Sequence, residues 1–137
     1  MKKCNKPCLA CPYIKEGKVI KSENGKWTSY INKSVNCNTY NLVYMIECKK
    51  ENCKKRYIGE TERTLKNRLA EHLGYINTKK INQATGAHFS QAGHSRDDLS
   101  ISIIEQITKK DTSYRKQREK HLIRKFNTYY NGINNKP

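Results

Sequence analysis

The chain has 137 residues and carries 28 Lys and Arg against 12 Asp and Glu, a formal net charge of +16. Hydrophobic residues make up 35% of it, which allows one modest core, and the longest apolar run, 42–46, is far shorter than the ~20 residues of a membrane-spanning helix. These numbers argue against a membrane protein. The positive charge favours nucleic acid as a partner, with an anionic membrane surface or a solvated basic surface as alternatives.

The first 40 residues contain four cysteines in a pattern typical of a zinc site. Cys4, Cys8 and Cys11 form a tight trio, and Cys37 follows them later in the chain. Zinc prefers four ligands in a tetrahedron, and short spacings let the backbone fold around the thiolates. The residues between Cys11 and Cys37 are mostly polar and show no sustained hydrophobic period. We therefore expect residues 1–40 to form a basic, zinc-pinned extension without an independent core.

The second part of the chain, residues 41–137, begins with a predicted β-hairpin. Apolar, β-branched and aromatic residues fill 42–46, a run typical of a buried strand. Residues 56–59 are expected to pair with this strand across a polar loop that Cys48 and Cys53 bracket.

Two helices are predicted after the hairpin. Thr61 or Thr64 is expected to cap the first helix. Its apolar face repeats at helical spacing over Leu65, Leu69, His72, Leu73 and Ile76. The second helix is expected over 84–91, where Gly93 stops it.

The remaining residues predict one more strand and one more helix. Leu and Ile alternate with Ser over 99–105, which predicts the strand, and the last helix is expected over 113–127, capped by Thr112 or Ser113. Three short strands and three helices predict an α+β fold, a small three-stranded antiparallel sheet flanked by helices.

A second metal site is predicted from the two remaining cysteines and a pair of histidines. Zinc would bind Cys48, Cys53, His88 and His94, while the other four cysteines form the first site. Six cysteines would suggest disulfides in an exported protein, but no apolar signal segment follows the basic N-terminus. Free thiols with surface histidines, or a partition that moves Cys37 between the sites, are the alternatives.

Polar side chains also stand on the apolar faces of two predicted helices. Glu119 shares the inward face of the last helix with three apolar residues, and burying an unpaired charge is costly. We therefore expect a divalent cation beside it, or a salt bridge to Arg68 or Arg118. Arg68 and His72 lie one helical turn apart and would meet one phosphate, as a planar fork and a proton carrier. Packing is the alternative role for His72.

Together these residues resemble the GIY-YIG nuclease superfamily, over roughly residues 41–135. The first motif stands here as Leu42-Val43-Tyr44, with Leu in place of the usual Gly, and the second as Tyr57-Ile58-Gly59. Behind them follow residues that match the family's Arg, His, metal-binding Glu and terminal Asn, namely Arg68, His72, Glu119 and Asn134.

This resemblance implies metal-assisted hydrolysis of a DNA phosphodiester. Glu119 would hold one Mg²⁺ or Mn²⁺, which neutralises phosphate oxygens and stabilises the departing 3′-oxygen, and Arg68 would bind the non-bridging oxygens. Tyr44 or His72 would take the proton from the attacking water, and Tyr57 would orient water or phosphate. Zinc in the two cysteine sites would be structural, because four protein ligands leave no open position. The implied catalytic set, braced by the terminal Asn, is Tyr44, Tyr57, Arg68, His72, Glu119 and Asn134.

The cysteine framework is similar, more narrowly, to the endonuclease domain of Penelope-like retroelements, which commonly follows a reverse transcriptase and nicks target DNA. This implies double-stranded DNA as substrate, RNA and a reverse transcriptase domain as further partners, no membrane partner, and an intracellular, nuclear location. We expect basic residues around the site to contact DNA, namely Lys54, Lys55, Arg63, Lys66, Arg115 and Lys116. A catalytically inactive, zinc-dependent nucleic-acid-binding module and a purely structural interaction protein are the competing interpretations.

Overall fold

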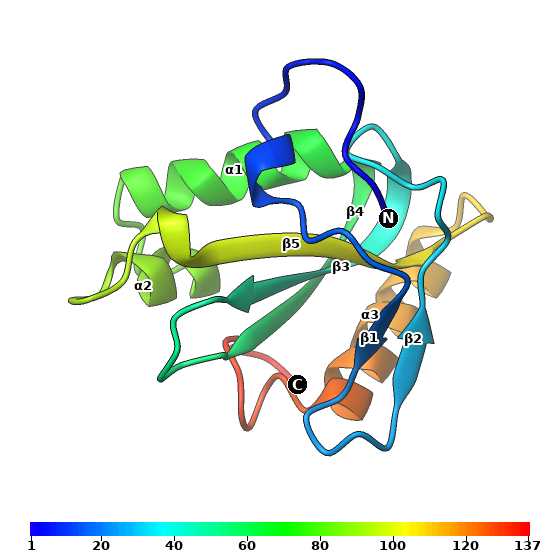
Figure 1. Cartoon of the computed structure of the whole chain (residues 1–137). Helices are drawn as coiled ribbons and strands as arrows, with labels where there is room; N and C mark the ends of the chain where they lie inside the picture. The colour runs from blue at the N-terminus through cyan, green and yellow to red at the C-terminus, as the bar shows by residue number, and fades with distance from the viewer.

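The computed structural model describes residues 1–137 and has the predicted α+β architecture (Figure 1). The chain forms, in order, η1 (Cys11–Tyr13), β1 (Val19–Lys21), β2 (Thr28–Tyr30), β3 (Tyr40–Cys48), β4 (Arg56–Thr64), α1 (Leu65–Asn77), α2 (Ala84–Ser90), η2 (Arg96–Asp98), β5 (Leu99–Gln106) and α3 (Thr112–Phe126). None of these helices combines the length and the apolar character that crossing a bilayer requires.

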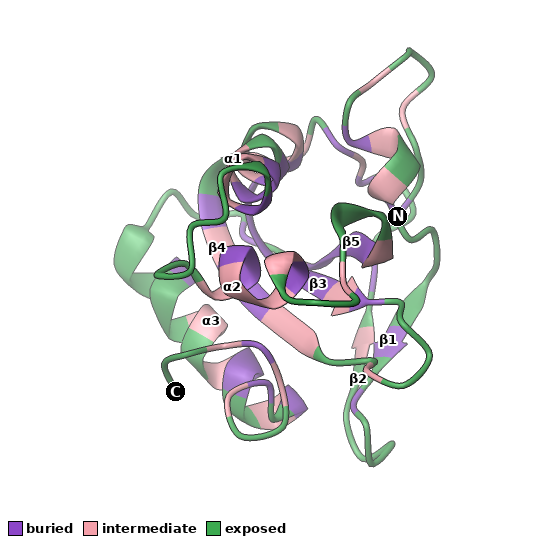
Figure 2. Ribbon diagram, turned by 90° about the vertical axis from the view of Figure 1, so that its left-hand side faces the viewer, coloured by how far each residue is buried: buried purple, intermediate pink, exposed green.

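The central sheet is antiparallel, with strand order β4-β3-β5. Residues 42–46 of β3 are fully buried, which agrees with the continuous apolar run there. Both α1 and α3 contact β4. In Figure 2 the edge strand β4 lies between these two helices, so their side chains can meet those of β4.

The ends of the helices follow capping chemistry. The Thr64 hydroxyl accepts a hydrogen bond from the Asn67 amide and caps α1, whereas Thr61 is a residue of β4, because that strand continues to Thr64. The predicted cap of the last helix is wrong: the helix begins at Thr112, and the Asp111 carboxylate accepts from the Tyr114 amide and caps α3. Ser, Thr and Asp all make good N-caps, so the residue types alone do not decide between neighbouring positions.

The N-terminal extension contains a small β-hairpin that the sequence pattern did not predict. In it, β1 and β2 pair antiparallel, with Ile20 opposite Ser29. Each strand has three residues, too few to display an alternating pattern. Ile14 forms a β-bridge to Ile101 at the free edge of β5, so the extension lies against that edge.

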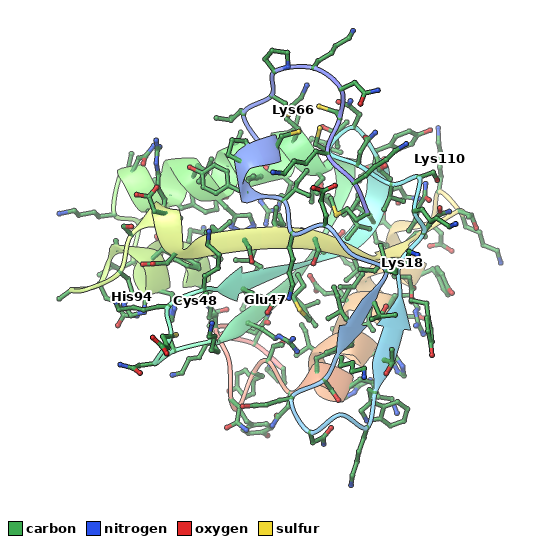
Figure 3. All side chains as sticks on the ribbon, in the orientation of Figure 1. Lys18, Glu47, Cys48, Lys66, His94 and Lys110 are labelled. Carbon is green, nitrogen blue, oxygen red and sulfur yellow. The ribbon has the colours of Figure 1, made fainter.

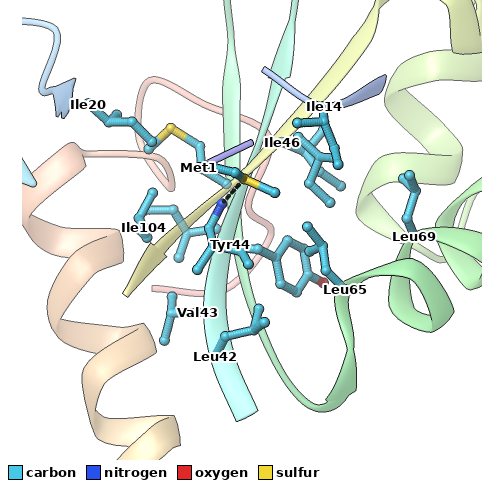
Figure 4. Packing of buried hydrophobic residues seen from close by; sticks show 14 of the residues in the cluster. Met1, Ile14, Ile20, Leu42, Val43, Tyr44, Ile46, Leu65, Leu69 and Ile104 are labelled. Carbon is cyan, nitrogen blue, oxygen red and sulfur yellow. Dashed lines mark hydrogen bonds between the residues drawn. The ribbon is translucent and has the colours of Figure 1, made fainter. Parts of the chain in front are cut away.

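The extension shares the core of the sheet. One cluster of 28 buried hydrophobic residues extends through the whole chain. Figure 4 shows Met1 in this cluster, near Tyr44 and Ile46 of β3. The members from the extension are Met1, Ala10, Ile14, Ile20, Ile31, Val35 and Cys37.

Candidate active site and metal clusters

Two phenol side chains stand on the same face of the sheet. In the β3–β4 register Tyr44 lies opposite Gly59 and Ile46 opposite Tyr57, which brings the ring centroids of Tyr44 and Tyr57 to 6.3 Å. A Cβ atom added to Gly59 would lie 2.4 Å from the Tyr44 hydroxyl oxygen. Glycine is therefore needed at position 59 for the Tyr44 ring to pack over the backbone of β4.

Helix α1 presents its Arg and His to the same phenol. The Arg68 Nε donates to the Tyr44 hydroxyl at 3.0 Å, and that hydroxyl lies 2.6 Å from the His72 Nε2. On its other side, the His72 Nδ1 lies 2.6 Å from the Thr85 Oγ1 of α2. Thr85 belongs to none of the motifs in the sequence, and only the structure shows its contact with His72.

Burial decides the protonation states of this group. It raises the pKa of Tyr44 well above the usual value and also raises that of Tyr57. Burial, followed by the positive charge of Arg68, lowers the pKa of His72 to about 3. Burial also opposes the charge of Arg68, but the neighbouring Tyr44 and Tyr57 outweigh it and keep that pKa above normal. At neutral pH the guanidinium is therefore charged, the phenols are protonated and the imidazole is neutral.

Glu119 projects from α3, half-buried and without a cationic partner. Arg118 donates two hydrogen bonds of 2.7 Å to Glu105, and Arg68 pairs with Glu71. The salt-bridge alternative for Glu119 is therefore wrong. Burial, with the charge of Glu60 as the next cause, raises the pKa of Glu119 to about 7. A half-buried carboxylate of this kind gains from a bound cation.

Asn134 holds the C-terminal segment against the edge of the sheet. Its Oδ1 accepts from the Ile58 amide and its Nδ2 donates to the Ile58 carbonyl, both at 2.8 Å. The Ile133 amide adds a hydrogen bond to the Arg56 carbonyl. These bonds fix the backbone on both sides of Tyr57, so Asn134 acts by bracing this strand.

The comparison with protein families decides the identity of this domain. The model of the GIY-YIG catalytic domain matches residues 40–134. The chain belongs to the GIY-YIG family. The resemblance stated from the motifs is confirmed at this level, and it implies an endonuclease whose substrate is nucleic acid. No curated protein and no solved structure matches the chain.

One of the residues predicted to contact DNA is buried inside this GIY-YIG domain. Arg115 is only 4% exposed, and its guanidinium donates to Glu60 at 2.5 Å and to Asn41 at 2.9 Å. The prediction of a DNA contact for Arg115 is therefore wrong, because its charge is neutralised inside the protein. The helical spacing already indicated that Arg115 is buried, since it stands four residues before Glu119 on the inward face of α3.

The other predicted DNA-contact residues lie at or near the surface. Lys54, Lys55, Arg63 and Lys116 are exposed, and Arg63 pairs with Glu71. Lys66 is half-buried at the start of α1, beside the N-terminal loop (Figure 3), where its amide donates to the Cys37 carbonyl. All five side chains remain candidates for phosphate contacts.

The four cysteines of the extension come together. The Sγ atoms of Cys4, Cys8, Cys11 and Cys37 all lie within 4.8 Å of one another, and all four thiols are free. Cys4 and Cys11 approach to 3.3 Å, and Cys8 and Cys37 to 3.4 Å. Four sulfur atoms this close fit a tetrahedral metal site that the protein closes completely.

The second cluster joins the β3–β4 loop to α2 and the loop that follows α2. Ligand atoms of Cys48, Cys53, His88 and His94 also lie within 4.8 Å of one another, and Figure 3 shows Cys48 and His94 at the same end of the sheet. Both ring nitrogens of His94 are buried and lack a hydrogen-bond partner. An orphaned buried imidazole beside two thiols fits a metal ligand, because coordination would satisfy one of its nitrogens. Cys37 lies with Cys4, Cys8 and Cys11, so the fold does not support the alternative in which Cys37 belongs to the second site.

Proposed function

We propose that this chain is a divalent-cation-dependent DNA endonuclease that hydrolyses phosphodiester bonds and makes nicks. The observation that carries the proposal is the Arg68–Tyr44–His72 hydrogen-bond chain, in a domain where Glu119 has no cationic partner. Phosphodiester hydrolysis needs a proton acceptor and positive charge on the phosphate oxygens. These residues would supply both.

The proton acceptor in this proposal is the pair of Tyr44 and His72. An arginine can only donate, so the Tyr44 hydroxyl, which accepts from Arg68, is free to donate to the His72 Nε2. When the Tyr44 oxygen takes a proton from the attacking water, its own proton moves to His72. Tyr57, the more exposed phenol, would orient the water or the phosphate.

Positive charge would come from Arg68 and from one metal ion. Arg68 binds the non-bridging oxygens as a planar fork. Glu119 would hold a Mg²⁺ or Mn²⁺ ion, which neutralises phosphate oxygens and stabilises the leaving 3′-oxygen. Ionised Glu119 is the form that binds the cation, so its raised pKa links cation binding to pH.

We also propose that the protein binds two structural zinc ions. The four-cysteine cluster would hold one, and Cys48, Cys53, His88 and His94 would hold the other. Elemental analysis of gently purified protein should return about two zinc ions per chain. Zero zinc together with six reactive thiols would contradict both sites. A value near one zinc ion per chain would mean that only one of the two clusters binds zinc.

The biological role that we propose is nicking of target DNA for a Penelope-like retroelement. The cysteine framework supports this role, together with RNA and a reverse transcriptase domain as partners and a nuclear location. The basic residues Lys54, Lys55, Arg63, Lys66 and Lys116 would contact the DNA backbone.

Conversion of supercoiled plasmid to open circle tests the enzyme proposal. The wild-type chain with Mg²⁺ should nick the plasmid, and chelation should stop it. The isosteric variant Glu119→Gln should be slower by about 10²- to 10³-fold, the order expected when one charge-stabilising group is lost. Circular dichroism should show that the variant is folded. A wild-type chain that binds DNA but nicks none of the DNAs offered would instead be the inactive binding module.

A further inference from the structure

Thr85 occupies a position that no motif of the sequence indicates. It lies on the short helix α2, and its side chain is 1% exposed. Its hydroxyl oxygen lies 2.6 Å from the Nδ1 of His72, which is itself 2% exposed. Both side chains are therefore shielded from water, and the Thr85 hydroxyl is the hydrogen-bond partner of the His72 Nδ1.

The hydrogen-bond chain favours one tautomer of His72. Because the Tyr44 hydroxyl accepts from Arg68, it can direct its own proton to the His72 Nε2, which then acts as the acceptor. In a neutral imidazole the other nitrogen then carries the hydrogen, so Nδ1–H donates to the Thr85 oxygen. Without this acceptor a buried N–H would lose its partner, and the tautomer with Nε2–H would no longer be disfavoured.

Helix α2 is held in place by two contacts that follow Thr85 in the sequence. A Cβ atom added to Gly86 would lie 2.3 Å from the Lys80 carbonyl oxygen, so the backbone of α2 packs directly on the turn that follows α1. His88, three residues after Thr85, faces the second metal cluster, where its Nε2 lies 3.4 Å from the Cys53 Sγ. One short helix therefore connects the metal cluster to the imidazole of the candidate active site.

We propose that Thr85 is a positioning residue for the nuclease reaction, which holds His72 as the Nδ1–H tautomer with Nε2 directed at Tyr44. Through α2, metal binding by Cys48, Cys53, His88 and His94 stabilises this arrangement. This inference rests on the proposed function, because it assigns His72 the proton-accepting nitrogen Nε2. Thr85 itself touches neither water nor phosphate in this role.

A pair of substitutions separates the hydroxyl from the packing. Thr85→Val keeps the shape of the side chain and removes the acceptor, whereas Thr85→Ser keeps the acceptor and removes a methyl group. Loss of the outer hydrogen-bond partner of a metal-binding histidine typically costs about 10- to 100-fold, and we apply the same range to His72. We expect Thr85→Val to slow single-turnover plasmid nicking by this factor, with unchanged DNA affinity, and Thr85→Ser to stay within about threefold of wild type.

The matched control is Ser102→Ala. Ser102 is a buried residue of β5 whose hydroxyl has no hydrogen-bond partner. Removing this hydroxyl should leave the nicking rate unchanged. Equal rates for Thr85→Val and wild type, or equal losses in Thr85→Val and Thr85→Ser, would overturn the positioning role.

Nitrogen-15 NMR of the histidine rings gives a readout that does not depend on nicking. We expect the His72 ring of the wild type to show the Nδ1–H tautomer, Thr85→Ser to retain it, and Thr85→Val to show a mixture or the opposite tautomer. A wild-type protein with this tautomer that fails to nick would contradict the proposed function but not the Thr85–His72 contact. A tautomer that Thr85→Val leaves unchanged would contradict the inference even if nicking is observed.

The link to the metal cluster is tested with Cys53→Ser in the same spectra. This variant removes one ligand from the β3–β4 loop and leaves the sequence of α2 intact. Amide hydrogen exchange in α2 should become faster than in the zinc-loaded wild type, and the His72 ring signals should shift. Unchanged exchange and unchanged His72 signals, in a variant that has lost one zinc ion, would show that the cluster does not support this site.

Discussion

The nuclease part of the chain and its N-terminal extension are held in place by different means. Around β3, β4 and α1 a continuous apolar pattern forms the core, and polar groups such as Tyr44 and His72 bond to each other within it. The extension, residues 1–40, is attached by scattered apolar side chains such as Ile20 and by its cysteine cluster. Substitutions in the first region should therefore alter the chemistry, whereas substitutions in the second should alter stability alone.

The largest expected effect on stability comes from Arg115 of α3. Arg115→Met removes one partner of the buried ion pair with Glu60 and should lower the free energy of unfolding by about 3–5 kcal/mol. The exposed neighbour Lys116 offers the matched control. Lys116→Ala should leave stability unchanged and should reduce the salt dependence of DNA binding by about one phosphate contact.

Urea unfolding and DNA titrations at several salt concentrations measure these two variants. If Arg115→Met had wild-type stability and weakened DNA binding instead, the buried role of Arg115 would be refuted.

In the extension, Ile20→Ala tests whether this region contributes stability alone. Ile20 is 4% exposed, and its truncation should lower the free energy of unfolding by about 2–5 kcal/mol through lost burial and the cavity left behind. Plasmid nicking, measured well below the melting temperature, should remain at the wild-type rate. A folded Ile20→Ala protein that no longer nicks would remove the distinction between the two regions.

Two glycines, one in each region, compare close packing with open space. Gly59→Ala places a Cβ atom against the Tyr44 hydroxyl, so it should cost about 1–3 kcal/mol of stability and also slow nicking by displacing Tyr44. Gly17, in the extension, has no neighbouring atom within 4 Å of an added Cβ. Gly17→Ala should therefore change neither quantity, and thermal melts with nicking assays on both variants check this.

The smallest expected effect is a pH dependence of cation binding at Glu119. Its pKa of about 7 means that the carboxylate is mostly protonated at pH 6 and mostly ionised at pH 8. Only the ionised form binds the cation, so Mg²⁺ affinity should rise by about tenfold across this range, close to 1.4 kcal/mol. Calorimetric titration with Mg²⁺ measures the change. The Glu119→Gln variant should show no such rise.

The sequence predicted the parts of this protein in which a pattern repeats. The apolar run at 42–46 and the helical spacing from Leu65 to Ile76 predicted β3 and α1 to within about two residues of the observed boundaries. The motifs then indicated the family. Their residues lie together in the structure, because Gly59 leaves room for the Tyr44 ring and Arg68 donates to the Tyr44 hydroxyl. Local patterning and family motifs therefore agree on the fold.

What the sequence missed depends on contacts between distant segments. Three-residue strands such as β1 and β2 do not reveal a period, so the hairpin of the extension went unpredicted. Thr85 meets His72 only because α2 packs against α1, and a threonine within a short helix indicates no function by itself. Arg115 was assigned to DNA because its charge was considered without its position on the inward face of α3.

The two edges of the central sheet are both covered by distant parts of the chain. At β4, Ile133 and Asn134 form hydrogen bonds with backbone groups of Arg56 and Ile58. At β5, the amide of Lys15 and the hydroxyl of Ser29 bond to the carbonyls of Ile101 and Ile104. Exposed strand edges pair readily with strands of other molecules and so promote aggregation. These contacts should help this small sheet to resist self-association at high concentration.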